Sequence, residues 1–174
     1  MTRRVSPSIP LPIETERLRL RALNESDALG VFGILGHEVT TRDVSWSQPT
    51  LAAATGWQER RMADQAAVGL SMWAVEERDA ARLVGLCGFF VADDPSEVEL
   101  GYVVHADYWG RGWATEAAGA AVSAMADTGM GVVATIRPDN HASLRVAAKI
   151  RLVHVENRDD ARGPLLVFRN RATA

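Results

Sequence analysis

The sequence predicts an α/β fold in which one mixed, mostly antiparallel sheet of six to seven strands is flanked by about four helices. The first observation is the order of the elements: one strand, two helices and three strands come before a helix, a strand, a helix and two strands. This order differs from the regular strand–helix alternation of a doubly wound sheet. The second observation is the stretch 97–118, which passes from a strand pattern through a glycine-rich turn into an alanine-rich helix. The length of 174 residues is that of one domain.

The composition excludes several classes of protein. Apolar residues make up 47% and charged residues 24%, as in an ordinary globular domain, and the net charge of −3 provides no basic field for nucleic acid. Cys87 is the single cysteine, so no internal disulfide can form, and the four histidines lack metal-ligand spacing. No apolar run is long enough for a signal-peptide core or a membrane span. We therefore expect a cytoplasmic protein that binds no metal, nucleic acid or membrane.

The beginning of the chain predicts a leader and a first strand. Residues 1–12 are rich in proline and serine, so we expect a flexible leader before a single domain over residues 13–174. Apolar and basic residues alternate over 14–21. Such alternation is typical of a half-buried strand.

Two helices and a loop follow the first strand. Asn24 or Ser26 can cap a helix that runs to about Gly36, since both side chains accept hydrogen bonds from first-turn N–H groups. Residues 50–67 predict a second helix. The loop between these helices contains a large aromatic residue, Trp46.

The middle of the chain predicts three strands. Residues 70–76 and 82–91 form a hairpin pattern around a charged turn, and 97–104 follows as the next strand. Gly85 and Gly88 lie inside the second of these strands. Glycines in a strand interior indicate bulges or close backbone contacts.

The last third alternates between helix and strand before it ends in two strands. Apolar and small residues over 114–125 fall on one helical face, and 132–136 is a short apolar strand. A Pro-Asp-Asn sequence ends that strand and leads into a helix over 140–150. The strands 153–157 and 165–169 then complete the sheet.

The glycine turn before the 114–125 helix predicts a binding site for an anion. Gly110 and Gly112 let the backbone approach a ligand without a Cβ in the way, and Ala114 keeps the first helical turn open. The first N–H groups of a helix lack partners, and the positive end of the helix dipole lies behind them. This combination indicates a cradle for a pyrophosphate.

The segment 109–117, Trp-Gly-Arg-Gly-Trp-Ala-Thr-Glu-Ala, resembles the acyl-CoA signature of the GNAT superfamily of N-acetyltransferases. That signature is Gln or Arg, two residues, Gly, one residue, then Gly or Ala; here Trp109 occupies the first place. The tryptophan, the Thr-Glu-Ala helix start and the Thr-Glu-Arg-Leu at 15–18 resemble the RimJ/RimL branch, which acetylates ribosomal-protein N-termini. The resemblance implies a GNAT sheet splayed between its fourth and fifth strands, with acetyl-CoA as the acetyl donor. It implies that the donor is bound by Tyr102, Val103, Val104, Trp109, Gly110, Arg111, Gly112, Trp113, Ala114, Thr115, Asn140 and Ser143.

A second segment, 138–152, resembles the helix motif that this superfamily places beside the cofactor. Asn140 fits a pantetheine partner or only a helix cap, and Ser143 fits a partner of the cofactor sulfur or an ordinary helix serine. Two positions depart from the family. The tyrosine that protonates the leaving thiolate is replaced by Ala147, which leaves Ser143 or water as the acid. The usual Gly-Phe is replaced by Arg151 and Leu152, so the helix end is expected to change shape, because the glycine of a left-handed C-cap is lost.

The resemblance implies direct attack of a primary amine on the thioester in a ternary complex. Glu99 lies where RimJ/RimL relatives have a glutamate and is the candidate base, while Glu97 on the same strand face is its backup and a substrate contact. Backbone N–H groups around Val103 and Val104 would polarise the carbonyl. Trp46 is either a wall of the acceptor pocket or a core residue.

Three functions remain open at this point. The leading one is N-acetylation of a protein N-terminus or a small-molecule amine. The second is a non-catalytic acyl-CoA-binding or regulatory module, which the replacements at Ala147 and Arg151 favour. A nucleotide-binding module is disfavoured because the 138–152 motif would have no role in it. The identity of the acceptor is left open, as is the choice between a monomer and a homodimer.

Overall fold

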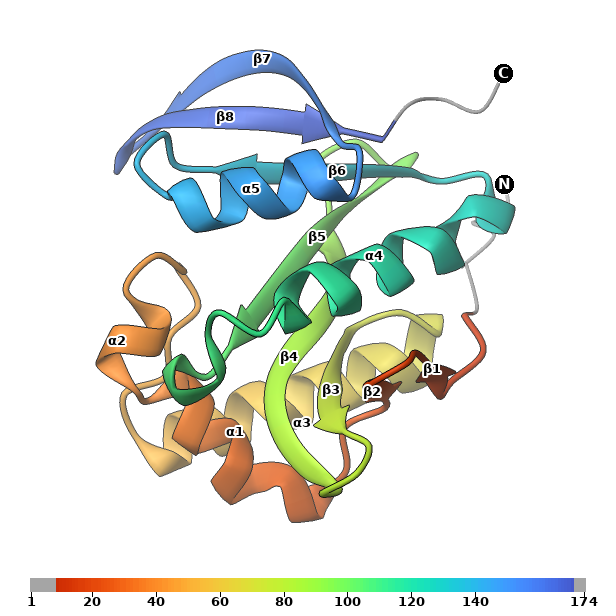
Figure 1. Ribbon diagram of the computed structural model, residues 1–174, viewed down its shortest axis with the longest axis vertical. Helices are drawn as coiled ribbons and strands as arrows, with labels where there is room; N and C mark the ends of the chain where they lie inside the picture. Colours follow the sequence, from red (N-terminus) through yellow and green to blue (C-terminus); the bar gives the residue numbers. More distant parts are fainter. Residues whose placement is uncertain (1–8, 171–174) are drawn as a thin grey trace.

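The computed structural model describes residues 9–170, which form one eight-stranded sheet with helices on both faces (Figure 1). The strand order is β1-β2-β3-β4-β5-β6-β8-β7. The strands are β1 (Ile13–Glu14), β2 (Leu18–Arg21), β3 (Met72–Glu77), β4 (Arg82–Val91), β5 (Glu97–Val104), β6 (Gly131–Ile136), β7 (Val153–Asp160) and β8 (Gly163–Arg169). The α-helices are α1 (Ala28–Leu35), α2 (Glu38–Thr41), α3 (Leu51–Val68), α4 (Trp113–Met125) and α5 (His141–Lys149).

The predicted fold class is confirmed, with two differences in the element count. All neighbouring strands are antiparallel except β5 and β6, which are parallel. The segment expected as one first strand is the short β1–β2 hairpin, so the sheet has eight strands. The short helix α2 was not predicted, and the imidazole of His37 caps it by accepting a hydrogen bond from the Thr40 backbone N–H.

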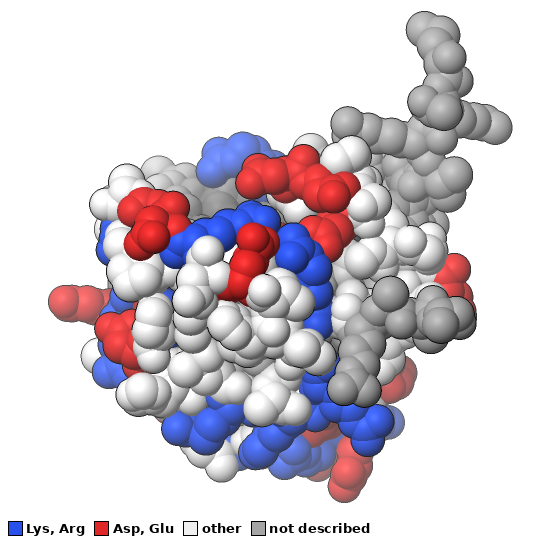
Figure 2. Space-filling view, turned by 90° about the horizontal axis from the view of Figure 1, so that it is seen from above, with Lys and Arg blue, Asp and Glu red and all other residues white. Residues whose placement is uncertain are grey.

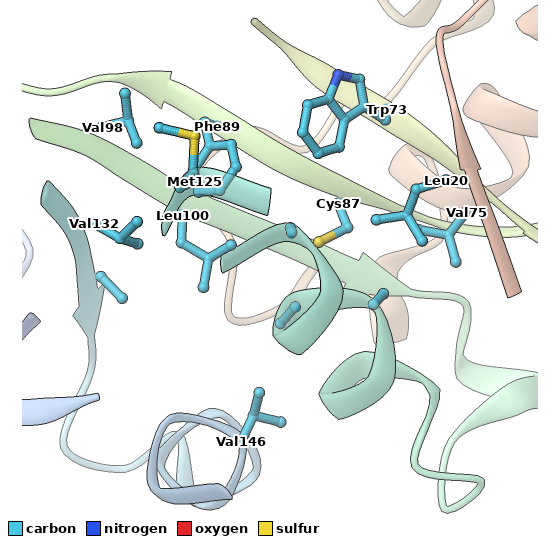
Figure 3. Close-up of a cluster of buried hydrophobic side chains, with 14 of the residues drawn as sticks. Leu20, Trp73, Val75, Cys87, Phe89, Val98, Leu100, Met125, Val132 and Val146 are labelled. Carbon is cyan, nitrogen blue, oxygen red and sulfur yellow. The ribbon is translucent and has the colours of Figure 1, made fainter. Parts of the chain in front are cut away.

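The two faces of the sheet carry two separate cores, because successive side chains of a strand point to opposite faces. On β3, Trp73 and Val75 face α4 and α5, where they pack with the residues drawn in Figure 3. Met72 and Ala74 face the other way and pack with residues of α1 and α3. In Figure 1, α4 and α5 lie in front of the sheet and α3 lies behind it.

The sheet is splayed between β5 and β6. These strands pair only where Glu97 to Glu99 face Gly131 to Val133, and β5 then continues to Val104 along β4 alone. Figure 1 shows the two strands diverging beyond this point. The remaining part of β5 therefore exposes backbone groups on its β6 side, in a gap between α4 and α5.

The glycines of β4 occupy the close backbone contacts expected of them. A Cβ at Gly85 would collide with the Val103 carbonyl oxygen, and one at Gly88 would collide with the Ser71 carbonyl oxygen. The register of the β3–β4 pair also shifts at Val75. Side chains at these glycines would push β4 away from its neighbours.

The ends of the helices explain why the sequence folds locally as it does. The Thr50 hydroxyl caps α3 by accepting from the Ala53 N–H at 3.2 Å, and Gly69 ends that helix with a φ of 71°. Asn24 is an N-cap as expected, but it caps a 3₁₀ turn that leads into α1. No helix within residues 9–170 is both long enough and apolar enough to cross a membrane.

Part of the expected leader is folded onto the domain. Residues 1–8 lie outside the described residues. Ile9 is 4% exposed and belongs to the core beneath α4, and Leu11 packs against the same core. These two side chains bury apolar surface against the domain.

Candidate functional site

The turn before α4 has the backbone that an anion cradle requires. Gly110 and Gly112 have φ values of +79° and +78°, a left-handed conformation that side chains disfavour. Gly112 is the N-cap of α4, and the Glu116 N–H makes the first intrahelical bond, to the Gly112 carbonyl at 3.1 Å. The N–H groups of Trp113, Ala114 and Thr115 therefore have no partner within the helix.

The start of α4 is fixed to the β1–β2 turn by a network around Glu116. The Arg17 guanidinium lies 2.6 Å from this carboxylate and also donates to the Arg111 carbonyl at 2.9 Å. The Thr15 hydroxyl donates to the same carboxylate at 2.6 Å. Burial favours the neutral acid, but the hydrogen bonds from Thr15 and Arg17 outweigh it and lower the pKa of Glu116. The network connects the Thr-Glu-Arg-Leu and Thr-Glu-Ala segments of the sequence.

A groove of about 420 Å³ extends from this cradle to α5. The structure brings eleven of the twelve predicted cofactor residues to it: Tyr102, Val103, Val104, Trp109, Gly110, Gly112, Trp113, Ala114, Thr115, Asn140 and Ser143. Three cations, Arg42, Arg145 and Lys149, also line the groove. Unpaired N–H groups and positive side chains therefore face the same space, which suits a ligand with several phosphate groups.

Arg111 is the predicted cofactor residue that does not line this groove. Its guanidinium lies over the rings of Tyr108 and Trp113, at 5.4 Å and 5.1 Å from their centroids. These contacts hold the side chain against the aromatic rings.

Trp109 has a structural contact that the signature did not indicate. Its indole N–H donates to the Val104 carbonyl at 2.7 Å, and Arg42 stacks over its ring. The bond shows that the backbone N–H and C=O groups of Val104 face away from β4, toward the gap beside β5. The backbone groups of Tyr102 face the same way, because the direction of these groups alternates from one residue to the next along an antiparallel strand. The N–H groups of Tyr102 and Val104 thus lie on the open edge of β5.

A second pocket, also about 420 Å³, lies on the β6 side of β5. Trp46 lines it and stacks on Trp57 with 5.7 Å between ring centroids, while the ring of Phe90 meets Trp46 edge-on at 5.6 Å. Trp46 therefore packs against the core beside α3 and faces the pocket at once. The turn between β7 and β8 contributes the opposite wall through Asp160 and Arg162.

Glu99 and Glu97 have different environments although both lie on β5. Glu99 lines the second pocket and accepts a hydrogen bond from the Thr135 hydroxyl at 2.5 Å. None of the ion pairs found within residues 9–170 includes Glu99. Glu97 lines neither pocket, because the Arg169 guanidinium holds its carboxylate at 2.6 Å. The structure therefore does not place Glu97 as a substrate contact or backup base.

The groove and the second pocket meet at a shared set of residues. Asp43, Val44, Tyr102, Asn140 and Ser143 line both spaces. A molecule in the groove and a molecule in the pocket could thus touch each other at this junction. The structure provides two binding spaces with one point of contact.

The side chains of Tyr102 and Ser143 both line this junction. Burial raises the pKa of Tyr102 to about 12, and the nearby Ser143 side chain opposes this only in part. The Asn140 side chain accepts from the Ser143 backbone N–H at 3.0 Å, so it caps α5 as predicted. Ala147, one turn further along α5, also lines the second pocket.

Sequence reasoning missed several residues of the site. Arg42, Arg145 and Lys149 gave no local signal, because only the docking of α2 and α5 beside α4 brings them to the groove. His37 and His105 line neither space, but their ring centroids lie 4.7 Å apart although the two residues are far apart in the sequence. Within residues 9–170, no three His, Cys, Asp or Glu side chains form a group that could hold a metal.

The C-terminal end of α5 has a different shape from the one predicted from the sequence. The loss of the family glycine was expected to change the shape of this helix end. Instead Arg151 itself adopts the left-handed conformation, with a φ of 63°. The Leu152 N–H bonds to the Ala147 carbonyl at 3.0 Å, as in an ordinary glycine-ended helix. The prediction of an altered helix end is therefore wrong.

The chain is similar to known proteins along most of its length. The Bacillus subtilis protein YkkB is 26% identical over 166 residues, covering 91% of this chain and 94% of that protein. The Bacillus subtilis protein YoaA, described as an N-acetyltransferase, is 30% identical over 153 residues, covering 79% of this chain and 80% of that protein.

Solved structures share the fold. A Bacillus anthracis acetyltransferase of the GNAT family superposes with a TM-score of 0.80 at 20% identity, covering 91% of this chain and 97% of that one. RimL, a ribosomal-protein α-N-acetyltransferase in complex with coenzyme A, superposes with a TM-score of 0.78 at 17% identity, covering 93% and 96%. The sequence profile of the Acetyltransferase (GNAT) domain matches residues 17–153. This chain therefore belongs to the GNAT acetyltransferase family.

Proposed function

We propose that this protein is an acetyl-CoA-dependent N-acetyltransferase whose acceptor is a primary amine bound between Trp46 and Glu99. The observation that carries the proposal is the junction of the two binding spaces at Tyr102, Asn140 and Ser143. Direct transfer needs donor and acceptor to be held in contact, and such positioning contributes much of the rate. One groove alone would support binding but would not explain the second pocket.

The groove fits the donor. Acetyl-CoA supplies the acetyl group, activated as a thioester, and carries phosphates at its other end. The N–H groups at the start of α4 and the side chains of Arg145 and Lys149 would hold these phosphates. The open edge of β5, with the N–H groups of Tyr102 and Val104, would hold the extended arm and polarise the carbonyl.

Glu99 is the candidate base. An amine must be neutral to attack, and an ammonium group near a carboxylate can lose its proton to it directly or through a water. Glu99 lacks a cationic partner among the described residues and faces the acceptor pocket, so it is free to bind the ammonium group of an acceptor. The Thr135 hydroxyl fixes the orientation of the carboxylate.

Ser143 is the candidate partner of the leaving sulfur. Its hydroxyl lies at the junction, one turn before Ala147, where the family tyrosine is missing. The phenol of Tyr102 lines the same junction. The phenol stays neutral at physiological pH because its pKa is about 12. The pair can therefore stabilise a developing thiolate without a charged side chain.

The test is a free-thiol assay with acetyl-CoA and a panel of amines, with mass spectrometry to identify the acetylated product. We expect release of coenzyme A that depends on the amine and matches the amount of product. Tight binding of acetyl-CoA without amine-dependent release from any member of a broad panel would instead support a non-catalytic acyl-CoA-binding module.

A further inference from the structure

The charges of the acceptor pocket divide into those that are neutralised inside the protein and those that are not. Arg137 donates to both carboxylate oxygens of Asp160 at 2.7 Å and to the carbonyls of Gly163 and Pro164 at 2.7 Å and 3.0 Å. Asp43 lies 3.2 Å from the exposed guanidinium of its chain neighbour Arg42. The Arg137–Asp160 pair is already satisfied and connects β6 to the β7–β8 turn.

Two opposite charges remain in this pocket. Glu99 has a hydroxyl partner but no cation, and Arg162 takes part in no ion pair within residues 9–170. Both residues line the pocket: Glu99 lies on strand β5, and Arg162 lies in the β7–β8 turn. The Arg162 side chain is exposed, so its guanidinium is available to a ligand. Viewed over β7 and β8, the surface has acidic and basic side chains next to each other rather than one dominant sign (Figure 2).

The rest of the pocket is apolar on one side. Trp46 and Phe90 form an aromatic wall of the pocket, and Leu165 lines the pocket as well. A volume of about 420 Å³ lies within the range of small-molecule sites. An occupant that satisfied all of these groups would have an ammonium group, an acidic group and an apolar body.

We infer that the acceptor is a free amino acid with an apolar or aromatic side chain, whose amine faces Glu99 and whose carboxylate faces Arg162. The inference rests on the proposed N-acetyltransferase function and narrows its substrate class. A protein N-terminus has the amine but no adjacent carboxylate. A simple alkylamine or polyamine has no group for Arg162 to bind.

The test compares three acceptors that share an aromatic body. Phenylalanine has both charges, phenylalanine amide lacks the carboxylate, and phenethylamine lacks the whole carboxyl group. We expect kcat/KM to be highest for phenylalanine. Because hydrogen bonds to charged groups are strong, Arg162→Gln is expected to lower kcat/KM for phenylalanine about tenfold, mainly through KM. The same variant should leave kcat/KM for phenethylamine unchanged.

Arg60→Gln is the matched control. Arg60 is exposed on α3 and lines neither pocket, so its replacement removes the same charge without touching the acceptor site. It should leave all three acceptors unaffected. If phenethylamine or phenylalanine amide is preferred and Arg162→Gln does not change the preference, the inference is wrong and the proposed function stands. If no amine is acetylated, the proposed function fails, and this inference fails with it.

Discussion

Tyr102 on β5 and Ser143 on α5 both line the groove from α4 and the second pocket, at the point where these two spaces meet. The two residues come from segments on opposite sides of the splay. At this junction the strand that would hold the donor therefore meets the helix that lies beside it. Ala147 is too small to reach this point as the family tyrosine would, and Tyr102 brings a phenol to the junction from the opposite side.

The first prediction concerns this pair. Ser143→Ala and Tyr102→Phe should each lower kcat with little change in the KM for acetyl-CoA. Loss of a general acid typically lowers the rate about 10²- to 10⁴-fold. The fall in kcat for these variants should be smaller, because water can also protonate a thiolate. The double variant should lose less than the sum of the two single losses, since both side chains would act on the same sulfur at one junction. Fully additive losses in kcat would contradict this coupling.

A second prediction follows from the pKa of Tyr102, about 12 in the folded protein against about 10 in the unfolded chain. Folding favours the neutral phenol, so this contribution to the free energy of unfolding is complete below pH 10. It should fall as the pH rises from there through about 12. Denaturant titrations across this range should show the fall in the wild type and a smaller fall in Tyr102→Phe.

The ultraviolet absorbance of the phenolate gives a direct check. The chain has two tyrosines, so Tyr108→Phe leaves Tyr102 as the single signal. Its midpoint should lie near 12. A midpoint at the ordinary value of about 10 would show that the phenol is solvated rather than buried.

The third prediction compares two glycines with the same backbone. Gly110 has a φ of +79° and Gly129 a φ of +73°, and a Cβ at either would meet nothing within 4 Å. Alanine at each should cost similar stability, about 1 to 2 kcal/mol. Calorimetry with coenzyme A should show weaker binding for Gly110→Ala and unchanged binding for Gly129→Ala. If both variants bind coenzyme A with the same affinity, the Gly110 turn is not part of the donor site.

The fourth prediction concerns the end of α5. Arg151 has a left-handed φ of 63°, where a glycine would have no Cβ strain. Arg151→Gly removes this strain and should raise the free energy of unfolding by about 1 kcal/mol. The greater conformational entropy of glycine in the unfolded chain will offset part of this gain. Arg151→Ala serves as the control, since it removes the charge but keeps the strain. If alanine stabilises as much as glycine, the effect comes from the charge and not from the backbone.

The parts of the site that the sequence could predict are the local ones. The cradle could be predicted from Gly110, Gly112 and Ala114, because a glycine turn and the helix after it are neighbours in the chain. The helix cap at Asn140 could be predicted because a cap residue directly precedes its helix. The splay of β5 from β6 was expected through the family resemblance, and it is present in the strand pairing.

The parts that could not be predicted depend on which segments meet. Glu97 and Glu99 look alike in the sequence, and only Arg169 on β8 distinguishes them. Arg145 and Lys149 are ordinary helix cations until α5 docks beside α4. The left-handed Arg151 could not be foreseen, because tertiary packing overrides the preference of that residue for other conformations.

The most direct test of the account is a pH–rate profile of Glu99→Gln beside Glu97→Gln, measured with a good acceptor. Glu97 is a matched control on the same strand, with its carboxylate held by Arg169 outside both pockets. If Glu99 is the base, its variant should lose about 10²-fold or more in kcat at neutral pH. The loss should shrink at high pH, where the amine deprotonates unaided, and Glu97→Gln should keep most of the activity. Wild-type rates for Glu99→Gln across the whole range would contradict the account.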